Sequence, residues 1–240
     1  MVSYKKHLDI ELFEGELKNH RYPWHFHDCY TLILVEKGSI FYQFQDSSYI
    51  VHSNELLVVE PFQVHRNTIS QPTVYKALFV PVELIESVGQ ARIENRMLAQ
   101  PSVIDSMVDL LRSIEFKCDQ EEAANRIFQL CKFINECPVK QEKDDWLRKG
   151  SAPEINCNLT IEQLAEAAHL SKFHFQRKFK KSYGLTIGQL KQQERTIKAK
   201  ILLERGKESA DVAYELGFFD QSHFIKYFKR MWATTPKNFH

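Results

Sequence analysis

The spacing of hydrophobic residues changes twice along the chain. From Tyr30 to Val80, short runs rich in β-branched and aromatic residues alternate with turn signals such as Lys37-Gly38-Ser39. Short strands at this spacing are typical of a β-sandwich or a small barrel. After Pro81 the hydrophobic residues recur with helical period, which predicts two amphipathic helices separated by a break at Cys118-Asp119-Gln120. Their predicted apolar faces are Ile104, Met107, Val108, Leu111 and Ile114 on the first, and Ala124, Ile127, Phe128, Cys131 and Ile134 on the second.

The C-terminal part of the chain contains one pattern twice, first over Leu159–Gly184 and again over Glu208–Trp232. Each copy predicts a short amphipathic helix, a tight turn and a second helix rich in Lys, Arg, Gln and His. This is the layout of a helix-turn-helix, whose second helix enters the DNA major groove. A single copy is equally compatible with a solvated basic face on an ordinary helical bundle. The second copy favours sequence-specific DNA binding.

The turns and caps of both copies follow from individual residues. Thr160 and Gln163 predict a capping box at the start of the first copy. Ser171 and Asp220 are typical caps for the two recognition helices. Between the copies, Ile187–Arg205 predicts one helix of roughly 28 Å. A helix of that length would hold the recognition helices about one DNA turn, near 34 Å, apart.

Charge divides the chain in the same way as the hydrophobic pattern. The segment from Leu159 to the end contains 15 Lys/Arg and 8 Asp/Glu, a net charge of +7, whereas the remainder contains 17 and 23, a net charge of −6. A basic C-terminal half suits a polyanionic partner. With 240 residues and 43% hydrophobic content, we expect two domains, at residues 1–137 and 158–240, joined by a linker at 138–157.

Targeting and cysteine signals are weak. No apolar run approaches the roughly 20 residues that span a bilayer, and the N-terminus lacks the apolar stretch of a signal peptide. We therefore expect a cytoplasmic protein with no membrane partner. The five cysteines are odd in number and scattered, with no Cys-x-x-Cys pair. This pattern predicts reduced thiols, with neither a disulfide framework nor a zinc site.

Three C-terminal segments resemble, in order and spacing, the DNA-binding domain of the AraC/XylS family over about Leu159–Phe239. The segments are LAEAAHLSKFHFQRKFKKSYGLTIGQL, AKILLERG and VAYELGFFDQSHFIKYFKRMWATTPKNF. The resemblance implies that bases are read by Phe173, Gln176 and Arg177 in the first unit and by Gln221, Ser222, His223 and Lys226 in the second. Lys172 and Lys181 are exposed lysines of the type that meets phosphate. Phe219 departs from the family, which commonly has a small or polar residue there. A large apolar group either packs or points at DNA, so base reading by the second unit is less defined.

The N-terminal half resembles the cupin-like ligand-binding domain of the same family through Trp24-His25-Phe26-His27-Asp28, Gly38 and the segment from Pro61 to Asn67. His25, His27 and His65 match in number the histidines of metal-binding cupins. The carboxylate ligand is missing, because Thr31 and Leu32 stand where the Glu would fall. We expect no metal and no cofactor, although three histidines could still hold an ion. The predicted ligand-binding residues are Trp24, His25, His27, Tyr30, Tyr42, His65 and Arg66.

The predicted fold is α+β: a cupin-like β-barrel with a helical pair, followed by an all-α domain with two helix-turn-helix units on a long helix. The predicted function is a ligand-responsive transcription regulator, an activator by family resemblance, and not an enzyme. Its partners would be double-stranded DNA, a small-molecule effector, RNA polymerase by the same resemblance, and a second copy of the chain paired through the two helical faces. Two alternatives remain: a metal-dependent cupin enzyme with a DNA-binding tail, and a regulator with no small ligand.

Overall fold

The chain forms two compact units in a computed structural model that describes residues 2–89, 92–138 and 159–239. The first unit comprises Met1–Asn19, Phe26–Gln63 and Asn67–Gly150, and the second comprises His20–His25, Val64–Arg66 and Ser151–His240. Apart from Pro138, the linker predicted at 138–157 lies outside the described residues. Within the described part of the chain, none of the helices is both long and apolar enough to cross a membrane.

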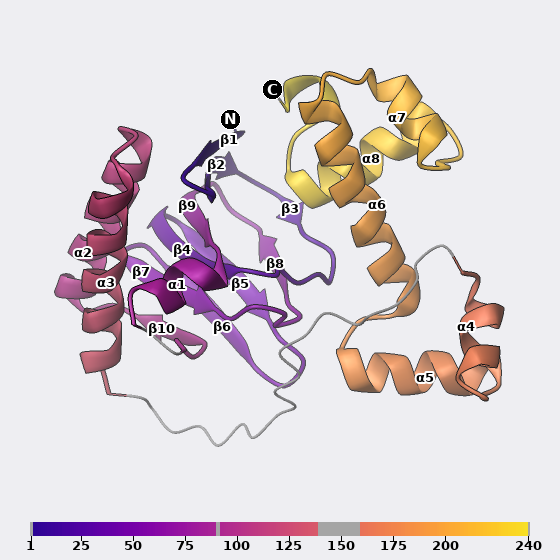
Figure 1. Cartoon of the computed structure of the whole chain (residues 1–240), viewed down its shortest axis with the longest axis horizontal. Coiled ribbons are helices and arrows are strands. Elements are labelled where there is room, and N and C mark those ends of the chain that lie inside the picture. The colour runs from indigo at the N-terminus through magenta and orange to yellow at the C-terminus, as the bar shows by residue number, and fades with distance from the viewer. Residues whose placement is uncertain (1, 90–91, 139–158, 240) are drawn as a thin grey trace. The chain divides into compact units, whose positions relative to one another are not determined.

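Two sheets make up the β domain (Figure 1). The larger has the order β1 (Val2–His7), β2 (Ile10–Leu17), β9 (Thr73–Val80), β4 (Tyr30–Lys37), β7 (Glu55–Val59) and β10 (Arg96–Leu98). The smaller has the order β3 (His20–Arg21), β8 (Arg66–Ile69), β5 (Ser39–Gln43) and β6 (Ser48–His52). The strands expected between Tyr30 and Val80 are confirmed. The sequence did not predict β1, β2, β3 and β10.

Alternation along β4 decides which side chains face the helices. Tyr30, Leu32 and Leu34 belong to the hydrophobic cluster that the larger sheet shares with the helices. Successive residues of a strand point to opposite faces, so the buried Thr31 and Ile33 face the barrel interior. Tyr30 was expected to line a ligand pocket in that interior. This expectation is wrong, because its ring packs among the helix-side residues and its hydroxyl accepts a hydrogen bond from the backbone N–H of Ile93.

Three helices accompany the sheets: α1 (Val82–Ser87), α2 (Pro101–Glu115) and α3 (Gln120–Glu136). The break between α2 and α3 is confirmed, and the Asp119 side chain caps α3 by accepting from the Glu122 backbone N–H at 2.8 Å. The predicted face of α3 differs from the buried face at two positions. Phe128 is 41% exposed and Ala124 is half-buried, and the buried face instead passes through Ala123 and Leu130.

The apolar faces proposed for pairing two subunits are also buried within one chain. Met107, Leu111 and Ile114 of α2 and Ile127, Cys131 and Ile134 of α3 all belong to the core cluster with the larger sheet. Burial of a thiol disfavours the thiolate, and the pKa of Cys131 rises to about 12. These side chains are core, and they cannot form a subunit interface.

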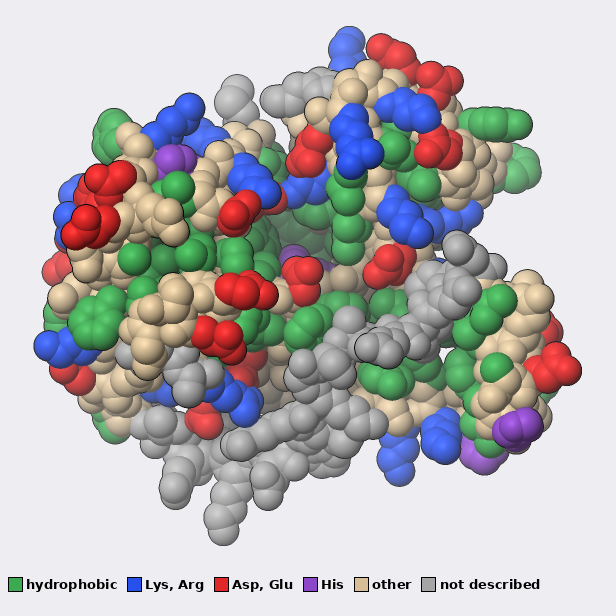
Figure 2. Space-filling model, viewed as in Figure 1, with side chains coloured by type: hydrophobic (Ala, Val, Ile, Leu, Met, Phe, Trp, Pro, Cys, Tyr) green, Lys and Arg blue, Asp and Glu red, His purple; other side chains and the backbone are tan. Residues whose placement is uncertain are grey.

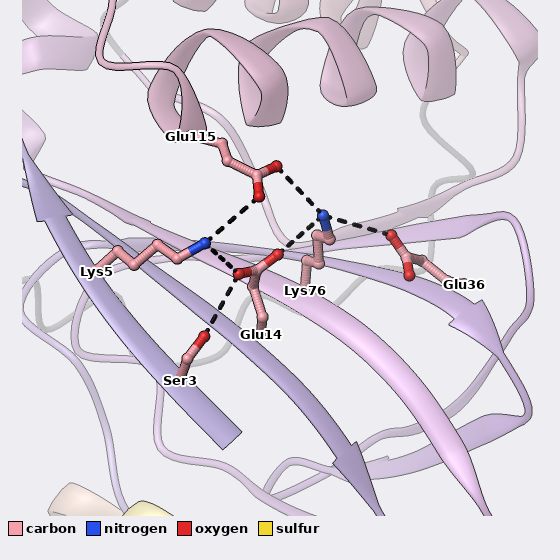
Figure 3. Close-up of polar contacts among 6 residues, drawn as sticks. All are labelled: Ser3, Lys5, Glu14, Glu36, Lys76 and Glu115. Atoms are coloured by element: carbon pink, nitrogen blue, oxygen red, sulfur yellow. Dashed lines mark hydrogen bonds and ion pairs between the residues drawn. The ribbon is translucent and has the colours of Figure 1, made fainter. Parts of the chain in front are cut away.

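An ion network joins the last turn of α2 to the larger sheet (Figure 3). Glu14 accepts from Lys5 at 2.8 Å and pairs with Lys76 at 3.0 Å, and Glu115 approaches both lysines at 3.4 and 3.8 Å. Partial burial raises the pKa of Glu14, but the hydrogen bonds from Lys5 and Lys76 outweigh it, so the pKa is lowered from its usual value. A solvent-accessible ion pair contributes only about 0–1 kcal/mol, and these pairs are partly exposed. The network therefore orients α2, while the hydrophobic cluster supplies most of the stability.

The C-terminal domain is helical, with α4 (Ile161–Ala167), α5 (Lys172–Tyr183), α6 (Ile187–Glu204), α7 (Ser209–Glu215), α8 (Gln221–Trp232) and the short 3-10 helix η1 (Pro236–Asn238). The capping box of Thr160 and Gln163 and the long helix from Ile187 are confirmed. A second capping box, formed by Thr186 and Gln189, starts α6. The helix α6 has 18 residues, about 27 Å, and both helix pairs contact it.

Candidate nucleic-acid interface and ligand site

The turns of the two helical pairs use the same hydrogen-bond motif. After α4, the Leu170 N–H donates to the Ala165 carbonyl at 2.9 Å and His169 is left-handed, with φ +53°. After α7, the Phe218 N–H donates to the Ala213 carbonyl at 2.9 Å and Gly217 is left-handed, with φ +65°. This is a Schellman end, which satisfies the last carbonyls of a helix and turns the chain. Both pairs are therefore helix-turn-helix units with matching turns.

Side-chain caps start both recognition helices. Ser171 accepts from the His174 backbone N–H at 3.4 Å, and Asp220 accepts from the His223 backbone N–H at 2.6 Å. Behind the caps, Phe179 in α5 and Phe224 in α8 are buried, so the opposite face of each helix is turned to solvent. Both predicted caps are confirmed.

The joining helix α6 holds the second turn in place. The Arg195 guanidinium donates to the Gly217 carbonyl at 2.5 Å, and its central carbon lies 5.0 Å from the centre of the Phe218 ring. At the other end of α8, the Trp232 indole N–H donates to the Thr196 carbonyl at 3.4 Å, and the Lys200 ammonium lies 4.8 Å from the Trp232 ring centre. These contacts tie the orientation of α8 to that of α6.

Most residues predicted to bind DNA are exposed on the two recognition helices. Gln176 is half-buried, and the exposed set is Lys172, Phe173, Arg177, Lys181, Gln221, Ser222 and Lys226. Figure 2 shows Lys and Arg side chains below α5 and, interspersed with Asp and Glu, over α6, α7 and α8. Two of the exposed residues already have partners within the domain. Lys172 pairs with Glu162, which lowers the pKa of that carboxyl, and the Gln221 amide nitrogen donates to the Ser209 hydroxyl at 2.8 Å.

His223 is turned inward rather than toward solvent. Its ring centre lies 4.7 Å from that of Tyr227 and 5.9 Å from that of Phe218. Its Nδ1 atom is buried and has no hydrogen-bond partner within the described residues. A half-buried ring in this position presents little of its edge to a base. We therefore leave His223 out of the proposed reading set.

Phe219 is the most exposed large hydrophobic residue described, at 91%. The sequence left open whether this side chain packs or points outward, and in the structure it points outward. It directly precedes Asp220, the cap of α8. Its position places an aromatic ring at the N-terminal end of the second recognition helix.

Three of the predicted ligand residues, His25, His27 and His65, lie close together in the β domain. His25 and His65 are paired by two backbone hydrogen bonds of 2.9 Å, and their ring centres lie 4.4 Å apart. One ring nitrogen of each of His25, His27 and His65 lies within 4.8 Å of the others. Burial disfavours the charged form of His25 and lowers its pKa to about 4, although Nδ1 lies 2.8 Å from the Pro23 carbonyl oxygen. A neutral His25 therefore donates from Nδ1, which leaves Nε2 as an acceptor.

The remaining predicted ligand residues lie in different environments. Arg66 stacks on Trp24, with 4.8 Å from the guanidinium carbon to the ring centre. Tyr42 of β5 is buried. Two residues that the sequence did not predict to bind ligand have buried polar atoms: Thr31 Oγ1 and Asn67 Oδ1 have no hydrogen-bond partner within the part of the chain that the structure describes. Such oxygens are costly unless something bonds to them. Only their burial, invisible in sequence, reveals them.

Comparison with protein families gives two matches that together cover both domains. A model described as the AraC-like ligand binding domain matches residues 7–145, and a helix-turn-helix domain model matches residues 164–240. The chain belongs to the AraC family. The first model alone covers more than half of the 240 residues.

Individual relatives of this AraC-family chain are regulators by name. An uncharacterized HTH-type transcriptional regulator, YbfI of Bacillus subtilis, is 28% identical over 90% of this chain and 86% of its own length. The HTH-type transcriptional activator RhaS of Escherichia coli is 22% identical over 94% of this chain and 90% of its own length. Among solved structures, an apo ToxT variant from Vibrio cholerae is similar with a TM-score of 0.59, 16% identity and 97% coverage of each chain. Wild-type ToxT bound to an unsaturated fatty acid is similar with a TM-score of 0.54 and 16% identity, covering 98% of this chain and 95% of its own.

The AraC-family fold confirms the predicted architecture, a cupin-like β domain followed by a tandem helix-turn-helix domain. Both predicted resemblances are therefore correct. At this level of identity the solved structures establish the fold, and the roles of individual residues rest on the geometry described above.

Proposed function

We propose that this protein is a cytoplasmic, ligand-responsive activator of transcription and not an enzyme. The observation that carries the proposal is the pair of matching helix-turn-helix units on one helix, each with a capped recognition helix and an exposed polar face. Membership of the AraC family and the name of the relative RhaS support activation rather than repression. Double-stranded DNA is the proposed partner of the C-terminal domain, and RNA polymerase is the proposed partner of the DNA-bound protein.

Base reading and phosphate contact are assigned to different side chains. Arg177 is exposed on α5, opposite the buried Phe179, and a guanidinium makes bidentate contacts with guanine in the major groove. Lys181 is exposed one helical turn further along α5, where a flexible ammonium meets phosphate without reading sequence. Lys172, Phe173, Gln176, Gln221, Ser222 and Lys226 complete the proposed contact set.

The test compares Arg177→Ala with Lys181→Ala on an operator selected with the full-length protein. Loss of a bidentate base contact costs about 1–3 kcal/mol at the specific site only. Arg177→Ala should therefore weaken operator binding while leaving binding to random DNA unchanged. Lys181→Ala should weaken both by similar factors. Equal losses on both DNAs for Arg177→Ala would remove its assignment as a reader, and failure of selection to enrich any sequence would remove the proposed function.

The effector site is proposed inside the β domain, around the buried polar atoms. Thr31 and Asn67 offer oxygens without partners among the described residues, and His25 and His65 add two buried imidazoles. A small organic molecule with hydrogen-bonding groups would satisfy atoms that the described chain leaves unpaired. Trp24 and Tyr42 would supply aromatic surface. An effector coupled to DNA binding must bind one conformational state more tightly than another.

Thermal shift with a panel of small polar and anionic molecules tests this site, because a ligand of the native state raises the melting temperature. Asn67→Leu preserves volume and removes the unpartnered carbonyl. The variant should keep or gain stability without ligand and should lose the ligand-induced shift. A ligand shift that survives Asn67→Leu and Thr31→Val would place the effector elsewhere.

The histidine cluster supports a second candidate, a transition-metal site in the barrel. The three histidine ring nitrogens lie within 4.8 Å of one another. Around a tetrahedral ion with metal–nitrogen bonds of about 2.1 Å, the nitrogens would be about 3.4 Å apart. The family carboxylate is also replaced, so the three imidazoles fit a metal poorly as they stand. Elemental analysis decides: about one metal per chain would revive the metal-dependent enzyme, and substoichiometric metal with a melting temperature unaffected by chelator supports the effector site.

We also propose a homodimer, through a different surface from the predicted one. The exposed apolar residues on the helical pair are Phe116, at the end of α2 and 82% exposed, and Phe128 of α3, 41% exposed. Large aromatic side chains left in water favour association. The core residues of α2 and α3 take no part.

A further inference from the structure

The two helix-turn-helix units differ by one residue between the turn and the recognition helix. In the first unit, Leu170 closes the turn and the next residue, Ser171, caps α5. In the second, Phe218 closes the turn in the same way, but Asp220 is the cap. Phe219 is therefore an extra residue in an otherwise matching motif. Neither the turn nor the cap requires it.

Phe219 also contributes little to the fold. It is 91% exposed, whereas the preceding Phe218 is 7% exposed and packs on Phe224 at 5.1 Å between ring centres. A phenyl ring in water forgoes the burial that normally accounts for an aromatic residue. The chain thus holds a hydrophobic group in solvent at a fixed point in the recognition unit.

The surroundings of Phe219 point to DNA as the group that covers it. It lies at the N-terminal end of α8, the part of a recognition helix that meets base edges in the major groove. Further along α8, Lys226, Lys229 and Arg230 are exposed and match the charge of phosphates. Phe173 places a second exposed ring, 82% exposed, in the first turn of α5. Both recognition helices therefore begin beside an exposed phenylalanine.

We propose that Phe219 is a specificity-determining residue that packs on the C5-methyl group of thymine in the box bound by α8. This inference rests on the proposed DNA-binding function and adds a reader outside the helix itself. A phenyl ring has no donor or acceptor, and the thymine methyl is the apolar feature that base pairs present in the major groove. The remaining polar side chains support such a division, because the Gln221 amide nitrogen is already bonded to Ser209 and the His223 ring is turned inward.

The test replaces each thymine of the selected operator, one at a time, by deoxyuridine, which differs only in lacking the methyl group. At one or two positions of the α8 box, this substitution should weaken the affinity of the full-length wild-type protein about fourfold. A fourfold change corresponds to the free energy of burying one methyl group. Phe219→Ala should bind the thymine operator more weakly by about the same factor or more. It should also bind the thymine and deoxyuridine forms of those positions equally.

Tyr214→Ala is the matched control, because Tyr214 is an aromatic residue of similar exposure, 89%, on α7 rather than beside α8. It should leave the thymine-to-deoxyuridine ratio at the wild-type value, and both variants should keep the wild-type melting temperature. The inference is overturned if Phe219→Ala keeps the wild-type ratio, if no deoxyuridine in the α8 box matters, or if that box contains no thymine. Unchanged operator affinity in Phe219→Ala also overturns it and would assign the ring to a protein partner. In all these cases Arg177→Ala still reports independently on DNA binding.

Discussion

Protonation of His25 should destabilise the β domain in mild acid. His25 is 6% exposed, and burial lowers its pKa to about 4, whereas an unfolded histidine titrates near pH 6.5. Because the folded pKa lies below the unfolded one, the unfolded state binds more protons between these values. The stability linked to His25 is therefore intact above about pH 6.5 and is lost as the pH falls toward about 4.

The size of the effect follows from the two pKa values. Between about pH 7.5 and about pH 5.5, linkage gives a loss of about 1.4 kcal/mol in the free energy of unfolding. His25→Gln has no titrating group at this position, so its stability should fall by about 1.4 kcal/mol less over the same interval. His52→Gln, at an exposed position at the end of β6, controls for the loss of an imidazole and should behave as wild type.

Urea unfolding at the two pH values, followed by hydrogen exchange of peptides from β4 and β9, measures the β domain without interference from the helical domain. The reasoning would be refuted if wild type and His25→Gln lost equal stability on acidification. The reasoning would also be refuted if acidification lowered the free energy of unfolding less in His52→Gln than in wild type, because the pH dependence would then not arise from His25.

Three further predictions follow from the packing and the turns. Leu111→Glu places a charge in the core and should leave the β domain unfolded. Phe128→Glu should stay folded and sediment as a monomer. A folded Leu111→Glu protein would contradict the assignment of Leu111 to the core. Gly217→Ala should lower the melting temperature, because a left-handed non-glycine residue costs about 1–2 kcal/mol, and His169→Gly should raise it. An insertion of about 5 bp between the two operator boxes should abolish joint binding, since α6 fixes their separation near one turn of DNA; undiminished gel-shift affinity would mean that one unit alone reads DNA.

The sequence predicted the helical domain well because its signals are local. Caps such as Thr160, Ser171 and Asp220 act within one turn of their own helix, and all three act as expected. Gly217 adopts the left-handed conformation that glycine favours after a helix. His169 adopts the same left-handed conformation although it is not a glycine, so its residue type does not predict the turn. The repeated hydrogen-bond pattern, rather than residue type, defines that turn.

The β domain was less predictable because its faces depend on what covers the sheet. Tyr30 and Thr31 are neighbours, and alternation alone states that they point in opposite directions without stating which faces the helices. The same ambiguity led to the wrong assignment of the α2 and α3 faces to a subunit interface. Apolar periodicity records that a face is buried, and a barrel in the same chain buries it as well as a second subunit does.

The two recognition helices should therefore divide the reading of an operator unequally. In the first, Arg177 is exposed and can bond to guanine, while Phe173 adds an apolar group. In the second, Gln221 is partly engaged with Ser209, His223 is turned inward, and the exposed ring of Phe219 stands at the helix start. Hydrogen bonds to guanine discriminate by about 1–3 kcal/mol, whereas one methyl contact contributes about 0.8 kcal/mol. Substitutions in the box read by α5 should thus weaken binding more than substitutions in the box read by α8, and α6 makes the weaker box effective by holding it in register with the stronger one.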